Sequence, residues 1–244
     1  DEIPLVYWIG CAGSFDDRNK KITLAMVKIL KATGVPFAIL GQEEGCCGDP
    51  ARRTGNEYLF QTLIQQNIEK LNNYKVKKIL THCPHCLHTI GTEYPQFGGN
   101  FEVVHHTQFL EDLMRTGKLK LTNEVKLSIA WHDSCYIGRY HDIFSAPRDL
   151  VKAIPGATLV EMPRHESRGV CCGAGGGRFW MEETIGEKIN DHRAKEGIEC
   201  QTQAIGSACP YCLVMMRDGV AALGKGETVR TLDLAEIVAQ AIAT

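Results

Sequence analysis

The chain of 244 residues lacks the features that mark several large classes of protein. Its 27 Lys and Arg residues are balanced by 29 Asp and Glu residues, so no charge excess indicates a nucleic acid or an anionic membrane as partner. No apolar run approaches the roughly 20 residues of a membrane-spanning helix. A secretory signal is also missing, because the chain opens on the acidic pair Asp1 and Glu2.

The sequence also lacks an initiator methionine, and we therefore expect a processed chain or a piece of a longer protein. Hydrophobic residues make up 44% and charged residues 23%, which is typical of a soluble globular protein. The length is sufficient for one large domain or two small ones with a core that needs no covalent cross-links.

Cysteine is the residue that is plentiful, with 11 copies. This is too sparse for a disulfide scaffold, and the odd number leaves one thiol over in any full pairing. Ten of the cysteines form two sets with matching spacing. The first set is Cys11, Cys46, Cys47, Cys83 and Cys86, and the second is Cys135, Cys171, Cys172, Cys209 and Cys212. Corresponding members lie 124 to 126 residues apart, from Cys11 to Cys135 and from Cys83 to Cys209.

The sequence around the two sets also repeats. GCCGDP matches VCCGAG, THCPHC matches SACPYC, and EVVHHTQFLEDL matches ETVRTLDLAEIV. A single internal duplication explains these matches. We predict one cysteine-rich repeat over residues 1–120 and a second over residues 121–244. The join at 117–123 is too short for an independent linker, so the two units are expected to pack against each other.

Each copy alternates short apolar runs with amphipathic stretches. In the first copy we predict strands over 4–9, 36–40, 76–80 and 101–105, and helices over 19–32, 57–71 and 108–114. In the second copy we predict strands over 127–131, 157–160, 203–206 and 227–231, and helices over 147–153, 182–196 and 234–243. The fold class is therefore α/β, with two pseudo-symmetric repeats, each a mostly parallel sheet flanked by helices. The cysteines follow predicted strand ends, where such sheets bind ligands.

The spacing of the cysteines favours a polynuclear metal centre. A CxxC pair alone fits zinc, an iron–sulfur centre or a redox dithiol. Adjacent cysteines cannot easily bind one tetrahedral ion, but they can bind different metal atoms of one cluster. Gly48 and Gly173 follow these pairs and allow a close approach of the backbone or a positive φ. Five thiols per set exceed the four that zinc or a simple cluster needs.

Two other interpretations of the cysteines remain open at this point. Structural disulfides are one, although a chain without a secretory signal favours a reducing compartment. Structural zinc in four-cysteine sites is the other. Cys200 has no counterpart in the first copy, and we interpret it as a spectator thiol.

The two complete cysteine patterns resemble the CCG-domain (cysteine-rich domain) family, which includes a subunit of heterodisulfide reductase and the iron–sulfur subunit of glycolate oxidase. YWIGCAGSFDDRNKK, CCGDPARRTGNEYLFQ and VVHHTQFL are most similar to the iron–sulfur oxidoreductases linked to electron-transfer flavoprotein and quinone. The resemblance implies two [4Fe-4S] clusters of the noncubane type, each bound by one set of five cysteines, with Gly48 and Gly173 beside them.

The function implied by the resemblance is that of an iron–sulfur oxidoreductase subunit. It would pass electrons between a flavoprotein or ferredoxin-type partner and a disulfide- or quinone-type acceptor, with a membrane subunit as a further possible partner and no nucleic acid. The alternative is a non-catalytic electron-relay subunit of a larger redox complex. The implied location is the cytoplasm, or the cytoplasmic face of a membrane reached through a partner or a preceding segment.

Several residues outside the cysteine sets are candidates for the chemistry. GAGGGRFW over 173–180 lacks the Lys-Ser/Thr of a P-loop and the spacing of a dinucleotide fingerprint, so we interpret it as tight backbone packing around the second cluster. We predict that the two cysteine sets share one face of the molecule. His82, His85 and Arg178 are the predicted catalytic residues, lining a pocket there together with the glycines of 173–177.

Overall fold

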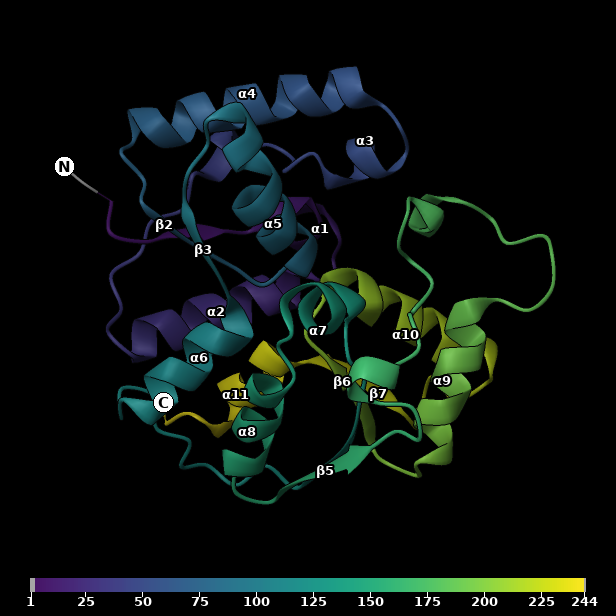
Figure 1. Cartoon of the computed structure of the whole chain (residues 1–244). Coiled ribbons are helices and arrows are strands. Elements are labelled where there is room, and N and C mark those ends of the chain that lie inside the picture. The colour runs from purple at the N-terminus through teal and green to yellow at the C-terminus, as the bar shows by residue number, and fades with distance from the viewer. Residues whose placement is uncertain (1–2, 244) are drawn as a thin grey trace.

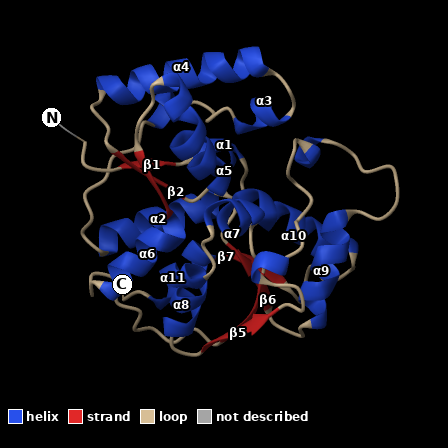
Figure 2. Ribbon diagram, viewed as in Figure 1, coloured by secondary structure: helices blue, strands red, loops and turns tan. Residues whose placement is uncertain are grey.

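The computed structural model describes residues 3–243 and contains two parallel sheets flanked by helices (Figures 1 and 2). The first sheet has the order β1-β2-β3, with β1 (Val6–Trp8), β2 (Lys78–Thr81) and β3 (Glu102–His105). The second has the order β5-β4-β6-β7, with β4 (Leu127–Trp131), β5 (Ala157–Glu161), β6 (Ala204–Ser207) and β7 (Arg230–Asp233). Every strand pair is parallel, which confirms the predicted fold class.

The helices alternate with these strands in the same order in both copies. The first copy contains α1 (Gly10–Phe15), α2 (Lys20–Ala32), α3 (Asp49–Arg53), α4 (Glu57–Asn73), α5 (Pro84–His88) and α6 (His106–Arg115). The second contains α7 (Cys135–His141), α8 (Ser145–Ala153), α9 (Ile189–Glu199), α10 (Pro210–Ala222) and α11 (Leu234–Ala241). Short helical turns are η1 (Gly41–Glu43), η2 (Thr89–Glu93), η3 (Tyr94–Phe97), η4 (Glu166–Arg168) and η5 (Arg178–Trp180).

Two predicted elements differ from the structure. The strand predicted over 36–40 is reduced to a single parallel bridge between Ala38 and Val6, because Pro36 has no N–H and Gly41 turns the chain at φ +59°. The helix predicted over 182–196 begins only at Ile189. Gly186 at φ +72° breaks the helical backbone ahead of it, so residues 181–188 form a loop.

The two copies pack through helix pairs, and each pair has a symmetric counterpart in which the corresponding helix of the other copy takes each place. α2 packs on α11 and α8 packs on α6, while α5 packs on α7 and α10 packs on α1. Since α2, α6, α1 and α5 correspond to α8, α11, α7 and α10, these contacts describe a pseudo-twofold relation (Figure 1). One apolar core also runs through both copies, from Ile22 and Leu80 to Ile129 and Val238. The repeats are therefore joined rather than independent; the boundary at residue 120 stays a prediction.

A buried polar contact reinforces this join. His106, the first residue of α6, lies 3.1 Å from Asp233, the residue before α11, measured between Nε2 and Oδ1. Both side chains are fully buried. Arg18 adds a salt bridge to Glu236 across the same interface.

Within residues 3–243, no helix is both long enough and apolar enough to span a membrane.

A candidate metal centre between the two repeats

The sheet topology brings the first cysteine set together. β1 and β2 are parallel neighbours, so Cys11 and the Cys83–Cys86 turn follow them at the same edge of the sheet. The thiols are neighbours in the order Cys11, Cys46, Cys47, Cys86 and Cys83. Gly10 closes this row from the backbone side: at φ +76° it has no Cβ, and one would lie 3.3 Å from the Cys86 sulfur. The result is a continuous row of five sulfurs.

The second set repeats this arrangement beside β4 and β6. Its thiols are neighbours in the order Cys135, Cys171, Cys172, Cys212 and Cys209. The Sγ atoms of Cys172 and Cys212 lie 3.3 Å apart. Each position in this row corresponds to the same position in the first row, so the duplication extends to the order of the sulfurs. In the described chain all of these cysteines are free thiols.

The CCG turn has the same geometry in both copies. Gly48 has φ +97° and Gly173 has φ +92°, which confirms the expected positive φ. The Gly48 N–H donates to the Cys46 sulfur at 3.5 Å, and the Gly173 N–H donates to the Cys171 sulfur at 3.3 Å. A side chain at position 48 would meet the Phe60 ring at 2.8 Å. The glycine is thus required both by the backbone conformation and by the space.

Each row has a buried end and a partly exposed end. The buried members are Cys47, Cys83 and Cys86 in the first set, and Cys172, Cys209 and Cys212 in the second. The partly exposed members are Cys11 and Cys46, and Cys135 and Cys171. A bound group would therefore be reachable from solvent at one end only.

Mutual hydrogen bonding holds a thiolate within each set. Hydrogen bonds from Cys46 and Cys86 lower the pKa of Cys47 to about 7, although burial opposes this. Burial also acts against ionisation of Cys209, but hydrogen bonds from Cys212 and His85 lower its pKa to about 5. Because the thiolate is the form that binds metal, both rows are prepared for a cationic metal centre. Five soft sulfur donors in one row fit an iron–sulfur cluster better than a single zinc ion.

The two rows are linked by the third residue of each CPxC turn. Tyr211, from the second copy, places its hydroxyl 3.6 Å from the Cys11 sulfur of the first. His85, from the first copy, lies beside the Cys209 thiol of the second. The two rings lie edge to face, with centroids 4.8 Å apart. The sites are therefore immediate neighbours on one shared face, as predicted.

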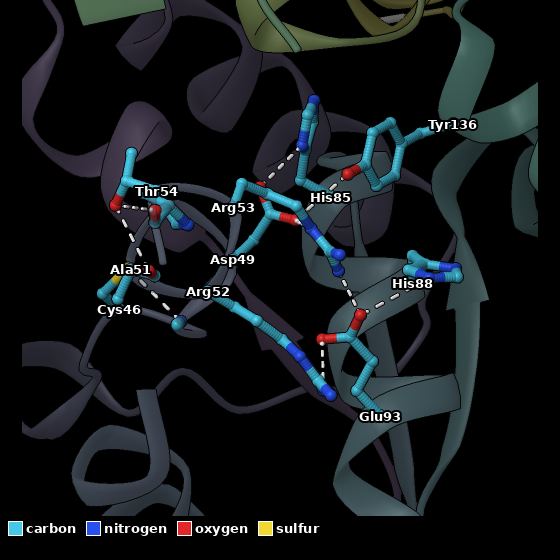
Figure 3. A network of polar contacts seen from close by, with 12 residues as sticks. Cys46, Asp49, Ala51, Arg52, Arg53, Thr54, His85, His88, Glu93 and Tyr136 are labelled. Carbon is cyan, nitrogen blue, oxygen red and sulfur yellow. Dashed lines mark hydrogen bonds and ion pairs between the residues drawn. The ribbon is translucent and has the colours of Figure 1, made fainter. Parts of the chain in front are cut away.

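A polar network fixes the His85 ring (Figure 3). Its Nδ1 lies 2.9 Å from Asp49 Oδ2, and the Tyr136 ring stacks on it at 4.0 Å while donating its hydroxyl hydrogen to Asp49 Oδ1 at 3.3 Å. Arg53 donates to Asp49 at 3.1 Å and also pairs with Glu93. Burial disfavours the charged ring, yet the Asp49 carboxylate and the Cys209 thiol raise the pKa of His85 above its usual value. The ring is held in one orientation towards the second set.

A model of the cysteine-rich domain matches this chain twice, over residues 5–91 and 129–217, which covers both sulfur rows. The chain belongs to the CCG cysteine-rich domain family. The family model and the observed repeats together confirm the resemblance found in the sequence.

Relatives of this CCG-domain protein carry names of redox proteins. It is 45% identical over 241 residues to the probable iron-sulfur-binding oxidoreductase FadF of Bacillus subtilis, covering 99% of this chain and 34% of the relative. It is 44% identical to EtfAB:quinone oxidoreductase of Syntrophomonas wolfei, covering 99% and 35%. Identity to a subunit of the dihydromethanophenazine:CoB--CoM heterodisulfide reductase of Methanosarcina barkeri is 34%, with 99% and 60% covered. The chain thus spans about a third of the length of the first two relatives.

The residues predicted as catalytic lie in different surroundings in this CCG-domain protein. His85 lies between the sets, whereas His82 is fully buried, with its Nδ1 2.7 Å from the Tyr7 hydroxyl. Arg178 lies in the exposed turn η5 and pairs with Glu183. The structure therefore does not bring the three side chains to one point.

The glycine segment does reach the shared face. A hollow of about 10 Å³, roughly the room of one water molecule, lies there, lined by Asp49, Pro50, His85, Ala174, Gly176, Gly177, Phe179, Trp180 and Tyr211. Sequence reasoning missed Tyr211 and Asp49. The signal for Tyr211 was its place in CPYC, which matches that of His85 in CPHC. Asp49 directly follows CCG, where its role depends on a contact 36 residues away.

Cys200 lies apart from both rows. Its thiol donates to the carbonyl of Glu196 at 3.3 Å, one turn earlier in α9. It stays, as predicted from the sequence, outside the proposed ligand sets.

Proposed function

We propose that this chain is the redox-active part of an iron–sulfur oxidoreductase and binds two [4Fe-4S] clusters, one in each row of five thiols. The noncubane type would be favoured by the fifth sulfur of each row, which is one more than a cubane [4Fe-4S] cluster needs. The ligands in this proposal are the ten cysteines of the two sets, and Gly48 and Gly173 contribute N–H groups to the sulfurs of Cys46 and Cys171.

One observation carries the proposal: two identical rows of sulfur are placed side by side and joined by His85 and Tyr211. Such clusters supply one-electron chemistry when bound. The chain's own residues hold the two sites in contact and orient donors towards them. Tyr211 places a hydroxyl at Cys11, and Asp49 holds His85 against Cys209. This closeness suits a reaction that needs two electrons.

The acceptor proposed for this site is a disulfide or a quinone, and the donor is a flavoprotein or a ferredoxin-type protein. The support lies in the names of two relatives, which refer to a heterodisulfide and to EtfAB and quinone. The partly exposed thiols Cys11, Cys46, Cys135 and Cys171 give an acceptor or partner a point of approach.

A relay function is the second candidate, and one observation favours it. The hollow at the shared face, about 10 Å³, is far smaller than the roughly 300 Å³ at which small-molecule pockets begin. In that case the two sites would only conduct electrons between partners bound at the exposed ends of the rows.

The test is anaerobic purification followed by analysis of iron and acid-labile sulfide and by EPR spectroscopy. Two clusters predict about eight irons per chain, from the composition of a [4Fe-4S] cluster. About four irons with matching sulfide would contradict the two-cluster proposal, and zinc in place of iron would remove it altogether. Assays with disulfide and quinone acceptors then separate the enzyme, which reduces one of them directly, from the relay, which reduces neither.

A further inference from the structure

A fully buried histidine lies behind the second row of thiols. His132 follows β4 directly and precedes Cys135 by three residues. Its ring offers a nitrogen that lies within 4.8 Å of the Cys172 and Cys212 sulfurs, which are themselves 3.3 Å apart. Taken alone, this group of one imidazole and two thiols has the composition of a metal site.

The hydrogen bonding of the His132 ring decides whether it can bind a metal or can only donate a hydrogen bond. Arg193 is also fully buried and donates its Nε–H to His132 Nδ1 at 3.1 Å. A guanidinium can only donate, so Nδ1 must supply the lone pair and the proton of the neutral ring must reside on Nε2. Nε2 is buried and has no partner among the described residues. It therefore carries an N–H that no acceptor among the described residues satisfies, in a ring that has a nitrogen within 4.8 Å of the Cys172 and Cys212 sulfurs.

Arg193 is itself held in place, which makes this tautomer permanent. Its Nη1 donates to the Arg164 carbonyl at 3.0 Å and to Glu196 at 2.5 Å. The proton of the His132 ring cannot move from Nε2 to Nδ1 without leaving the Arg193 Nε–H unsatisfied in the core, so Nε2 does not offer a lone pair.

The first copy provides an independent comparison. The residue three positions before Cys11 is Trp8, which is fully buried. Its indole Nε1–H also has no partner among the described residues. Trp8 lies in the same apolar cluster as Cys47, Cys83 and Cys86. An indole can donate a hydrogen bond but cannot bind a metal through that nitrogen. Both copies thus place an unsatisfied N–H donor at the equivalent position.

We propose that His132 is a positioning residue that donates its Nε2–H to a cysteine sulfur of the second set, Cys172 or Cys212, and is not a ligand. This inference rests on the proposed function, because it requires a cluster on that set. Hydrogen bonds to cluster sulfurs stabilise the more negative, reduced state and raise the reduction potential. His132 therefore makes the second site easier to reduce than it would be without the donor.

The test compares His132→Phe, which removes the donor at similar size, with His132→Gln, which keeps an N–H. In anaerobic protein, an EPR-monitored redox titration should show that His132→Phe makes the second cluster harder to reduce by about tenfold, or ~59 mV for one electron. His132→Gln should recover part of this shift. Iron content should be unchanged in both variants, and Trp8→Phe, as matched control, should leave the second cluster unaffected.

A measurement on the unaltered protein covers the case in which the variants do not fold. Pulsed EPR on ¹⁵N-histidine-labelled protein should show an exchangeable proton near the cluster and only weak nitrogen coupling. Strong coupling of a directly bound nitrogen, or loss of one cluster's iron in His132→Phe, would make His132 a ligand and overturn the inference. An unchanged potential would do so as well. Absence of iron from the second set in the unaltered protein would instead contradict the proposed function.

Discussion

The two copies agree in their sulfurs and differ in what surrounds them. In the first copy CCG leads straight into α3, and its Asp49 and Arg53 build the network that fixes His85. In the second copy CCG leads into glycines and a loop that exposes Trp180 and Ile185, at 57% and 84% of their surface. The duplicated motif therefore fixes the order of the sulfurs in both copies. The residues that follow the motif surround the first CCG turn with buried polar groups, and they leave the second CCG turn followed by an exposed loop with both apolar and charged side chains.

The largest effect is expected from a substitution that removes the second site and leaves the first. Cys172→Ser should lose about half of the iron, because Cys172 lies in the middle of the second row, between Cys171 and Cys212. Iron and sulfide analysis of anaerobically purified protein measures the loss.

Cys200→Ser is the matched control for that loss. It replaces a thiol that packs on the core and donates to the carbonyls of Glu196 and Glu161, away from both rows, so iron content should stay at the level of the unaltered protein. Loss of a cluster in this variant would show that the ligand set assigned to the second copy is wrong.

The next effect concerns the residues that precede α6 and α11, which occupy equivalent positions. Asp233 caps α11 and contacts buried His106 across the copies, whereas His105 caps α6, bonds to Thr107 and packs on its neighbour His106. Asp233→Ala should lower the free energy of unfolding by about 3 kcal/mol or more, because it leaves a buried polar partner unsatisfied. His105→Ala should lower it by about 1 kcal/mol for the lost cap and by about 2 kcal/mol more for the space that the fully buried ring leaves.

Chemical denaturation followed by circular dichroism measures both changes. Asp112→Ala is the control: Asp112 forms an exposed pair with Arg115, and its loss should change the free energy of unfolding by less than about 0.5 kcal/mol. A loss of stability in Asp233→Ala no larger than that in Asp112→Ala would mean that the contact between the copies contributes nothing.

A smaller difference is expected between the two CCG glycines. Gly48 and Gly173 share a positive φ, so alanine at either position adds backbone strain of about 1–2 kcal/mol. The added Cβ would lie 2.8 Å from the Phe60 ring at position 48 but 3.1 Å from Ile189 at position 173. Gly48→Ala should therefore be the more destabilising change. If thermal unfolding shows Gly48→Ala to be equally or less destabilising than Gly173→Ala, the Phe60 ring moves aside more easily than its packing suggests.

The sequence predicted the parts of this molecule that depend on local pattern. The spacing of the cysteines, the alternation of strands and helices, and the duplication were all readable, and β4 was placed to the residue. Contacts between distant parts of the chain could not be predicted from the sequence. The approach of Tyr211 to Cys11 and of Arg193 to His132 joins residues 200 and 61 positions apart, and no periodicity encodes them. The start of α9 was missed because helical periodicity continued through Gly186, whose φ interrupts the backbone.

The smallest expected effect tests the bridge between the sites. Tyr211→Phe keeps the ring against His85 and removes only the hydroxyl at Cys11, so iron content should not change and the free energy of unfolding should change by about 1 kcal/mol at most. The first cluster should become slightly harder to reduce, because one hydrogen-bond donor to its sulfur is lost, while the second should be unaffected. Tyr140→Phe, at a half-exposed ring stacked on Tyr136, is the control and should shift neither potential. An equal shift of both reduction potentials in Tyr211→Phe would mean that Tyr211 acts on the two sites through their common packing. Its hydroxyl would then not distinguish the first site from the second.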